Sequence, residues 1–411
     1  MDKMFEFSRA NLALLELIKI GIGTSKKDFD FSALDAEEWQ CVYSECQKQA
    51  ISLLCFEGLK GFENYVPENI YSKWVNYCLI KTVLNMKILE SQNILVKILA
   101  SKNIDYLILK GASSASYYPN PELRCFGDID FLIDIKNWDI VKQYFIDNGY
   151  RVSNDEHYYH STFVKGYSVF EMHKQIGGIP NGPQGDAISA YISNALERYE
   201  LVGEPHFRKP DDALHGIIIV LHTVHHLLSK GLGLRHLCDW ACFVKNTHKM
   251  HFWQNELLVK FKDFGIYKFV SELTYVSVKY LGIDKPEWLV EYSDEFADEL
   301  FGIFFKSGNF GSKNVHMAKS YGMFYKGDIN LTLCKKTINM IRALNETNEK
   351  LYPVLKKVKV FYPFIMIWRV LKYLLLQVQG KRPSLIKVSR YTDLKNEFYL
   401  KWKLFTTDEK Q

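Results

Sequence analysis

The segment Gly127-Asp-Ile-Asp-Phe-Leu-Ile-Asp134 decides the fold class of this chain. Acids fall at alternate positions of an apolar run, and a period of two residues is typical of a β-strand. Asp128 and Asp130 should therefore leave the same face of a sheet, while Ile129 and Phe131 enter the core on the other face. We expect a strand over 128–134 that presents a pair of carboxylates.

Two carboxylates this close repel each other unless a cation lies between them. Oxygen donors of this kind suit a hard divalent cation such as Mg²⁺. The pattern alone is a weak signal, because an acidic strand face exposed to solvent has the same appearance and Asp134 continues the register. The surrounding sequence has to decide between the two interpretations.

A short apolar strand precedes this segment and ends at Lys110-Gly111, where small residues begin a helix. A glycine at such a turn lets backbone amides approach phosphate oxygens, and the start of a helix favours anions. Ser113 can add a hydroxyl, and the nearest cations, Lys110 and Arg124, can pair with a triphosphate. These residues predict a phosphate cradle.

Two further strands, 159–164 and 168–175, are joined by Lys165-Gly-Tyr167 and should form a hairpin. The second strand places Glu171 and His173 on one face by the same alternation. If it lies beside the Asp-x-Asp strand, Glu171 completes a three-carboxylate cluster suited to two metal ions and to displacement at an α-phosphate. His173 then either contacts phosphate and moves a proton, or serves as an ordinary strand histidine.

Helical periodicity surrounds this central region, which predicts an α+β fold with a small mixed sheet between helical ends. We divide the chain into a helical region over 1–102, a core over 103–176 and a second helical region over 177–411. The first long helix should open with Asp35-Ala-Glu-Glu38, which has the form of a capping box. The expected helices are 35–57, 67–101, 137–147, 186–199, 211–229, 235–247, 252–263 and 266–281.

The bulk composition is that of an ordinary globular protein, with 47% hydrophobic and 24% charged residues and a net charge of +5. This mild charge suits an enzyme that handles phosphates, and we expect no nucleic-acid partner. The eight cysteines form no CxxC pair, which argues against a disulfide framework and a zinc ribbon. The amino terminus shows no secretion signal, so we expect a cytoplasmic protein.

The stretches Leu109-Lys-Gly-Ala-Ser113, Leu123-Arg124 and Gly127-Asp-Ile-Asp-Phe-Leu132 resemble the polymerase-β-like nucleotidyltransferase superfamily. More narrowly, they resemble bacterial nucleotidyltransferase-like proteins often linked to surface-polysaccharide gene clusters. The further matching stretches are Phe170–His173, Leu221–His226, Leu234–Asp239 and Gly308–Gly311. The resemblance implies transfer of a nucleoside monophosphate from an NTP such as ATP to an acceptor, for example a polysaccharide precursor, with two Mg²⁺ ions that Mn²⁺ can replace.

Under this interpretation the candidate residues fall into three groups. The metal ligands and catalytic residues are Asp128, Asp130 and Glu171, of which Glu171 also helps to deprotonate the acceptor. The residues that hold the nucleotide are Lys110, Gly111, Ser113, Arg124 and His173. The resemblance adds a wall of the catalytic cleft formed by His222, Arg235 and Asp239.

Two other features have more than one interpretation. His222, His225 and His226 lie at i, i+3 and i+4 on a helix, a spacing that can bind zinc, but we favour packing beside the active site. Residues 353–377 are apolar and basic, yet too short and too charged to span a bilayer. They suit an anionic membrane surface, a protein partner or a core helix, and we favour the core helix.

Two other functions fit the same residues. If the acceptor is a protein side chain, the chain is a protein-modifying adenylyltransferase. Alternatively, Ala112 follows Gly111 where the superfamily usually has serine or glycine. That departure suits a scaffold that kept the fold and lost turnover. The sequence identifies neither the base of the nucleotide nor the acceptor.

Overall fold

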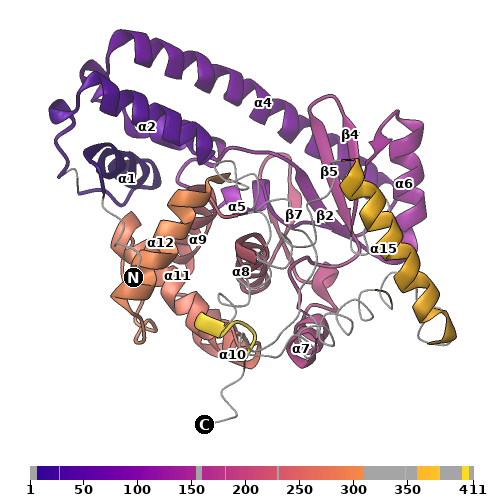
Figure 1. Ribbon diagram of the computed structural model, residues 1–411. Helices are drawn as coiled ribbons and strands as arrows, with labels where there is room; N and C mark the ends of the chain where they lie inside the picture. Colours follow the sequence, from indigo (N-terminus) through magenta and orange to yellow (C-terminus); the bar gives the residue numbers. More distant parts are fainter. Residues whose placement is uncertain are drawn as a thin grey trace.

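A five-stranded mixed sheet lies at one side of the molecule, next to a long helix from the amino-terminal region (Figure 1). The computed structural model describes residues 7–26, 28–153, 160–180, 182–228, 231–309, 348, 359–379 and 400–406. In sheet order, the strands are β1 (Tyr106–Ile108), β2 (Ile129–Ile133), β5 (Ser168–His173), β4 (His160–Lys165) and β3 (Arg151–Val152). The predicted α+β class is confirmed.

The register of the sheet sets the positions of the candidate carboxylates. Strands β2 and β5 run parallel, with Asp130 opposite Glu171 and Leu132 opposite His173, whereas the other pairs are antiparallel. The predicted hairpin is present as β4 and β5. The Asp-x-Asp strand is one residue shorter at each end than predicted, so Asp128 lies just before β2.

The two faces of the sheet enter different apolar cores. Ile129, Phe131 and Ile133 pack with side chains of helices α4 (Glu68–Ser101) and α6 (Trp138–Asp147). Leu132 points the other way and joins the larger core, which is built by side chains from both helical regions, α4 included. This alternation is the one predicted from the sequence, and both faces of β2 are covered because all five of its residues are buried.

The amino-terminal region consists of α1 (Arg9–Ile22), α2 (Ala36–Lys48), α3 (Ser52–Gly58) and α4. The Asp35 capping box is present, and α4 starts directly after Pro67 as expected. The single helix predicted over 35–57 is wrong. Ala50 takes a positive φ of 55° and breaks it into α2 and α3, at a point where the sequence has no glycine or proline.

The carboxy-terminal half places α8 (Asp212–Leu228) in the middle of the molecule (Figure 1). Around it lie α7 (Pro183–Tyr191), α9 (Leu234–Thr247), α10 (Leu258–Asp263), α11 (Tyr267–Leu281) and α12 (Asp294–Ser307). The predicted helix over 252–263 begins instead with a π-helical turn, Trp253–Leu257, before α10.

The expectation of a purely helical chain after residue 185 is wrong. The predicted helix 186–199 ends early, and a second hairpin follows, made of β6 (Tyr199–Val202) and β7 (Phe207–Pro210). Strand β7 packs beside β1. Short four-residue strands give too few alternations to be separated from helix ends by pattern alone.

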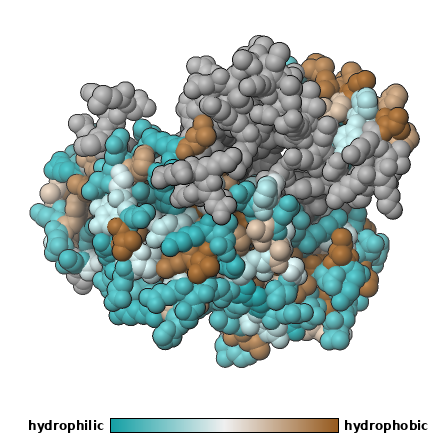
Figure 2. Space-filling model, turned by 90° about the horizontal axis from the view of Figure 1, so that it is seen from below, coloured by the Kyte–Doolittle hydropathy of each residue, from teal (hydrophilic) through white to brown (hydrophobic). Residues whose placement is uncertain are grey.

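Residues 362–378 form an exposed helix, α15, drawn in gold in Figure 1. We expected a buried core helix here, and that expectation is wrong for the described part, because no side chain of α15 is buried. Residues 353–358 lie outside the described residues. A search of the described helices finds none long and apolar enough to cross a membrane. Where Figure 2 colours the surface, it is largely hydrophilic with separate apolar patches.

Candidate functional site

The chain reverses sharply between β1 and the single-turn helix α5 (Ala112–Ala115) at Gly111. Its backbone angles, φ of 66° and ψ of −108°, are ones that residues other than glycine adopt only under strain. A Cβ added there would meet nothing closer than the backbone oxygen of Asp128 and the ring of Phe126, both at 3.9 Å. The glycine is therefore required by backbone conformation, since an added Cβ would make only ordinary van der Waals contacts there.

Asp130 is the most enclosed candidate ligand, with 2% of its surface exposed. Its Oδ1 lies 2.8 Å from Nζ of Lys110 and 3.1 Å from Nε2 of His173. The same histidine nitrogen lies 3.7 Å from Oε2 of Glu171. Because β2 and β5 are parallel partners, Asp130, Glu171 and His173 form one cluster, and their donor atoms lie close enough together to hold a metal ion.

The charges in this cluster favour an ionised carboxylate beside a charged lysine. Burial alone would raise the pKa of Asp130, but Lys110 and His173 hold it well below its ordinary value. Burial would lower the pKa of Lys110, yet the charges of Asp130, Asp128 and Glu171 raise it above its usual range. Three carboxylates thus act on one ammonium group, which leaves an excess of negative charge that a divalent cation would neutralise.

Arg124 and Asp239 form a buried bidentate ion pair. Nε and Nη2 of Arg124 lie 2.8 Å from the two carboxylate oxygens of Asp239, and the hydroxyl of Tyr118 donates to the same carboxylate. Burial would raise the pKa of Asp239, but the Arg124 guanidinium lowers it. Arg235, one turn before Asp239 on α9, donates to the backbone oxygen of Cys125 at 3.1 Å. These contacts tie the loop before Asp128 to α9.

Asn85 of α4 holds the same loop from the other side and was missed in the sequence. Its amide donates to the carbonyls of Glu122 and Arg124, and its Oδ1 accepts the backbone N–H of Phe126. The only sequence signal is a polar residue within the apolar stripe of a long helix. Ser113, predicted to hold phosphate, is fully buried and its hydroxyl donates to the carbonyl of Ile108.

A family model described as "Uncharacterised nucleotidyltransferase" matches residues 35–282, which is more than half of the chain. The chain belongs to this nucleotidyltransferase family. No curated protein and no solved structure shows a significant match to this chain. The matched range of this nucleotidyltransferase includes the five-stranded sheet and every candidate site residue, whereas α12 and α15 lie beyond it.

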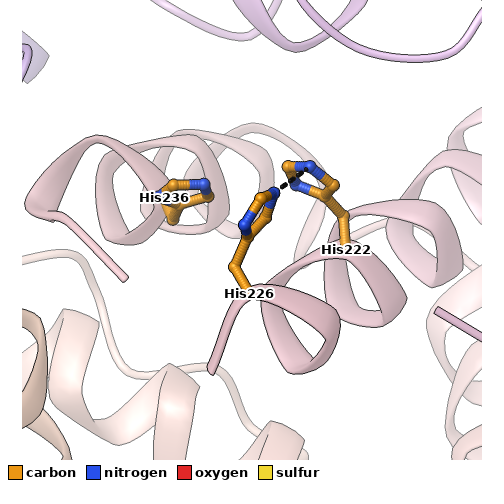
Figure 3. A group of neighbouring side chains, drawn as sticks. All are labelled: His222, His226 and His236. Carbon is orange, nitrogen blue, oxygen red and sulfur yellow. Dashed lines mark hydrogen bonds between the residues drawn. The ribbon is translucent and has the colours of Figure 1, made fainter. Parts of the chain in front are cut away.

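The nucleotidyltransferase also contains a histidine cluster next to Lys110. Nε2 of His222 lies 2.8 Å from Nζ of Lys110 and 2.7 Å from Nε2 of His226. The third ring of the cluster is His236 of α9 (Figure 3). The sequence had suggested His225 as the third member, because spacing along one helix cannot reveal which residue of a neighbouring helix faces it.

Proposed function

We propose that this nucleotidyltransferase is a metal-dependent, polymerase-β-like enzyme that transfers a nucleoside monophosphate from an NTP to an acceptor and releases pyrophosphate. The observation that carries the proposal is the pairing of Asp130 with Glu171 on adjacent parallel strands, with Lys110 beside them. Family membership supports nucleotidyl transfer in general. The metal, the nucleotide and the acceptor belong to the proposal.

Asp128, Asp130 and Glu171 would hold two Mg²⁺ ions, which Mn²⁺ can replace. The donor set fits these ions because it is rich in carboxylate oxygen and carries more negative charge than Lys110 balances. When bound, the ions would stabilise the charge on the transferred phosphoryl group and on the attacking and leaving oxygens. Glu171, whose side chain is 22% exposed, is more accessible than Asp130 and would accept the proton of the acceptor.

The remaining residues would position the nucleotide. Lys110 would pair with the triphosphate, and Gly111, which has no side chain, would let the backbone approach it. His173 would orient Asp130 through the hydrogen bond that the two share. Because Arg124 is already paired with Asp239, we assign it to holding the loop before Asp128 rather than to direct phosphate contact.

His222, Arg235 and Asp239 would belong to the wall of the cleft, since each is joined by one contact to Lys110 or to the loop before Asp128. The charge of Asp128 acts to raise the pKa of both Lys110 and Arg235, which supports assigning the wall and the carboxylates to one site.

Contact with an anionic membrane surface or a protein remains a proposal for residues 353–377. Its support is the exposure of apolar side chains on α15 next to basic ones, Arg369 and Lys372. The exposed apolar residues include Phe364, Ile367, Trp368, Leu371 and Leu375.

Label transfer tests the proposed function. Each of the four NTPs, labelled at the α-phosphate, is incubated with the protein, Mg²⁺ and an extract of the organism that encodes it. We expect the α-label, but not a γ-label, to enter a product with release of pyrophosphate, and Asp130→Asn to abolish this. Asp134→Asn is the matched control, because Asp134 lies just outside the strand and accepts the backbone N–H of Lys136.

The nature of the labelled product separates the acceptors. A protease-resistant product supports a sugar or polysaccharide precursor, and labelled protein bands support the protein-modifying alternative. Transfer that is equal in wild type and Asp130→Asn would overturn the proposed site, and no transfer from any NTP would contradict the proposed activity.

A further inference from the structure

We propose that His222, His226 and His236 form a second metal site, of the zinc class, separate from the carboxylate cluster. The family match does not assign such a site, and the proposal does not depend on nucleotide transfer.

The geometry of the three rings carries the inference. His222 and His226 lie one turn apart on α8, and His236 comes from the first turn of α9. One ring nitrogen from each residue lies within 4.8 Å of the other two. Ring centroids are separated by 4.2 Å for His222 and His226, 5.5 Å for His222 and His236, and 5.1 Å for His226 and His236. Figure 3 shows the ring of His226 beside that of His222, to which it is hydrogen-bonded, with the ring of His236 on its other side.

The distances are close to those of a bound zinc ion. With Zn–N bonds of about 2.0–2.1 Å, tetrahedral ligand nitrogens lie roughly 3.3 Å apart. Nε2 of His222 and Nε2 of His226 are 2.7 Å apart. To admit the ion the two rings must separate slightly, and Nζ of Lys110, 2.8 Å from the same His222 nitrogen, must move away from it. Three imidazoles leave the fourth position of the tetrahedron open, as in zinc sites that bind water or a substrate.

The chemistry of the donors points to a transition metal rather than Mg²⁺. All three ligands are imidazole nitrogens, which suit Zn²⁺, whereas the neighbouring cluster offers mainly carboxylate oxygen. Metal binding requires neutral imidazole, and burial lowers the pKa of His222 well below its ordinary value and that of His236 to about 3. Nζ of Lys110 contacts both clusters, 2.8 Å from Oδ1 of Asp130 and 2.8 Å from Nε2 of His222.

Zinc content of the purified full chain, expressed without a histidine tag, tests the proposal. The protein is incubated with ZnCl₂, passed through gel filtration and analysed by mass spectrometry of the metal. We expect about one zinc ion per chain in wild type, and at least a tenfold lower content in His226→Gln and in His236→Gln. Substitution by Co²⁺ should give the visible absorption bands of a tetrahedral site with nitrogen ligands.

Two control variants make the result specific. His225→Gln changes a half-buried histidine of the same helix that is outside the cluster, and it should keep its zinc. Asp130→Asn should also keep its zinc. A failure of the proposed nucleotide site therefore leaves the zinc measurement unaffected. Circular dichroism checks that each variant is folded.

A wild-type protein that retains no zinc, or variants that retain as much as wild type, would overturn the proposal. The rings would then serve hydrogen bonding alone, in an arrangement where Nδ1 of His236 accepts the backbone N–H of Gly233 and Lys110 contacts His222.

Discussion

Arg124 shows how a residue can matter to a site without touching its ligand. Its guanidinium is buried in a bidentate pair with Asp239, and its backbone carbonyl is held by Asn85. Arg124 was predicted to hold the triphosphate, but composition and spacing cannot say whether an arginine pairs with a phosphate or with a carboxylate of a distant helix. The same limit explains why His236 and Asn85 were missed.

A double-mutant cycle measures this buried pair. Arg124→Met leaves the Asp239 carboxylate without its main partner, and Asp239→Leu leaves the guanidinium without one. Each single change should lower the free energy of unfolding by about 3–5 kcal/mol, because an unpaired buried charge remains. The double variant should lose much less than the sum. Urea unfolding provides the values, and additive losses would show that the two side chains do not depend on each other.

His215 on α8 provides a prediction for pH. Burial, followed by the nearby charge of Lys209, lowers the pKa of this histidine well below its ordinary value, so it stays neutral in the folded protein. In the unfolded chain it takes up a proton near pH 6.5. The unfolded state therefore binds more protons below that pH, and stability must fall as the pH decreases from 7 to 5.

The comparison of wild type with His215→Gln isolates this contribution from other histidines that titrate in the same range. Between pH 7 and pH 5 the variant should lose less unfolding free energy than wild type, by up to about 2 kcal/mol, the limit set by an unfolded pKa near 6.5. Parallel pH profiles, measured by urea unfolding, would show that His215 is not a buried neutral group.

At the scale of elements, β2 was the best-predicted part of the molecule. Its period-two pattern gave both its faces, and the hairpin of β4 and β5 followed from Gly166 between two apolar runs. The pairing of β2 with β5 could not be predicted from the sequence, because the two strands lie about forty residues apart in the chain. The β6–β7 hairpin, the break at Ala50 and the exposure of α15 were mispredicted, because tertiary contacts rather than local pattern decide them.

The turn between β1 and α5 offers a matched pair of glycines. Gly111→Ala should destabilise the protein by about 1 kcal/mol or more, because φ of 66° is strained for alanine even though no atom clashes with its Cβ. Gly127→Ala should have little effect, since Gly127 has no positive φ and open space around its Cβ position. Thermal unfolding compares the two, and equal losses would contradict a special role for the Gly111 backbone.

In the whole molecule, the charged candidate site lies at the sheet, which separates two apolar cores. One face of the sheet is sealed by α4 and α6, and the other face meets the core around α8 and α9, where Asp130, Lys110 and the three histidines lie. The α+β class and the alternation of faces along β2 could be predicted from the sequence, whereas the approach of Glu171 to Asp130 depends on the pairing of β2 with β5. The boundaries at 102 and 176 stay a prediction, and so do the roles of the site residues.

Calorimetric titration of nucleotides tests the central claim most directly. The four NTPs are titrated with and without Mg²⁺ into wild type, into the double variant Asp128→Asn with Asp130→Asn, and into Asp134→Asn as the control. We predict that at least one NTP binds wild type and the control only with Mg²⁺, and binds the double variant at least tenfold more weakly. Equal binding by the double variant, binding without Mg²⁺, or no binding of any NTP would contradict a metal-dependent nucleotide site at these aspartates.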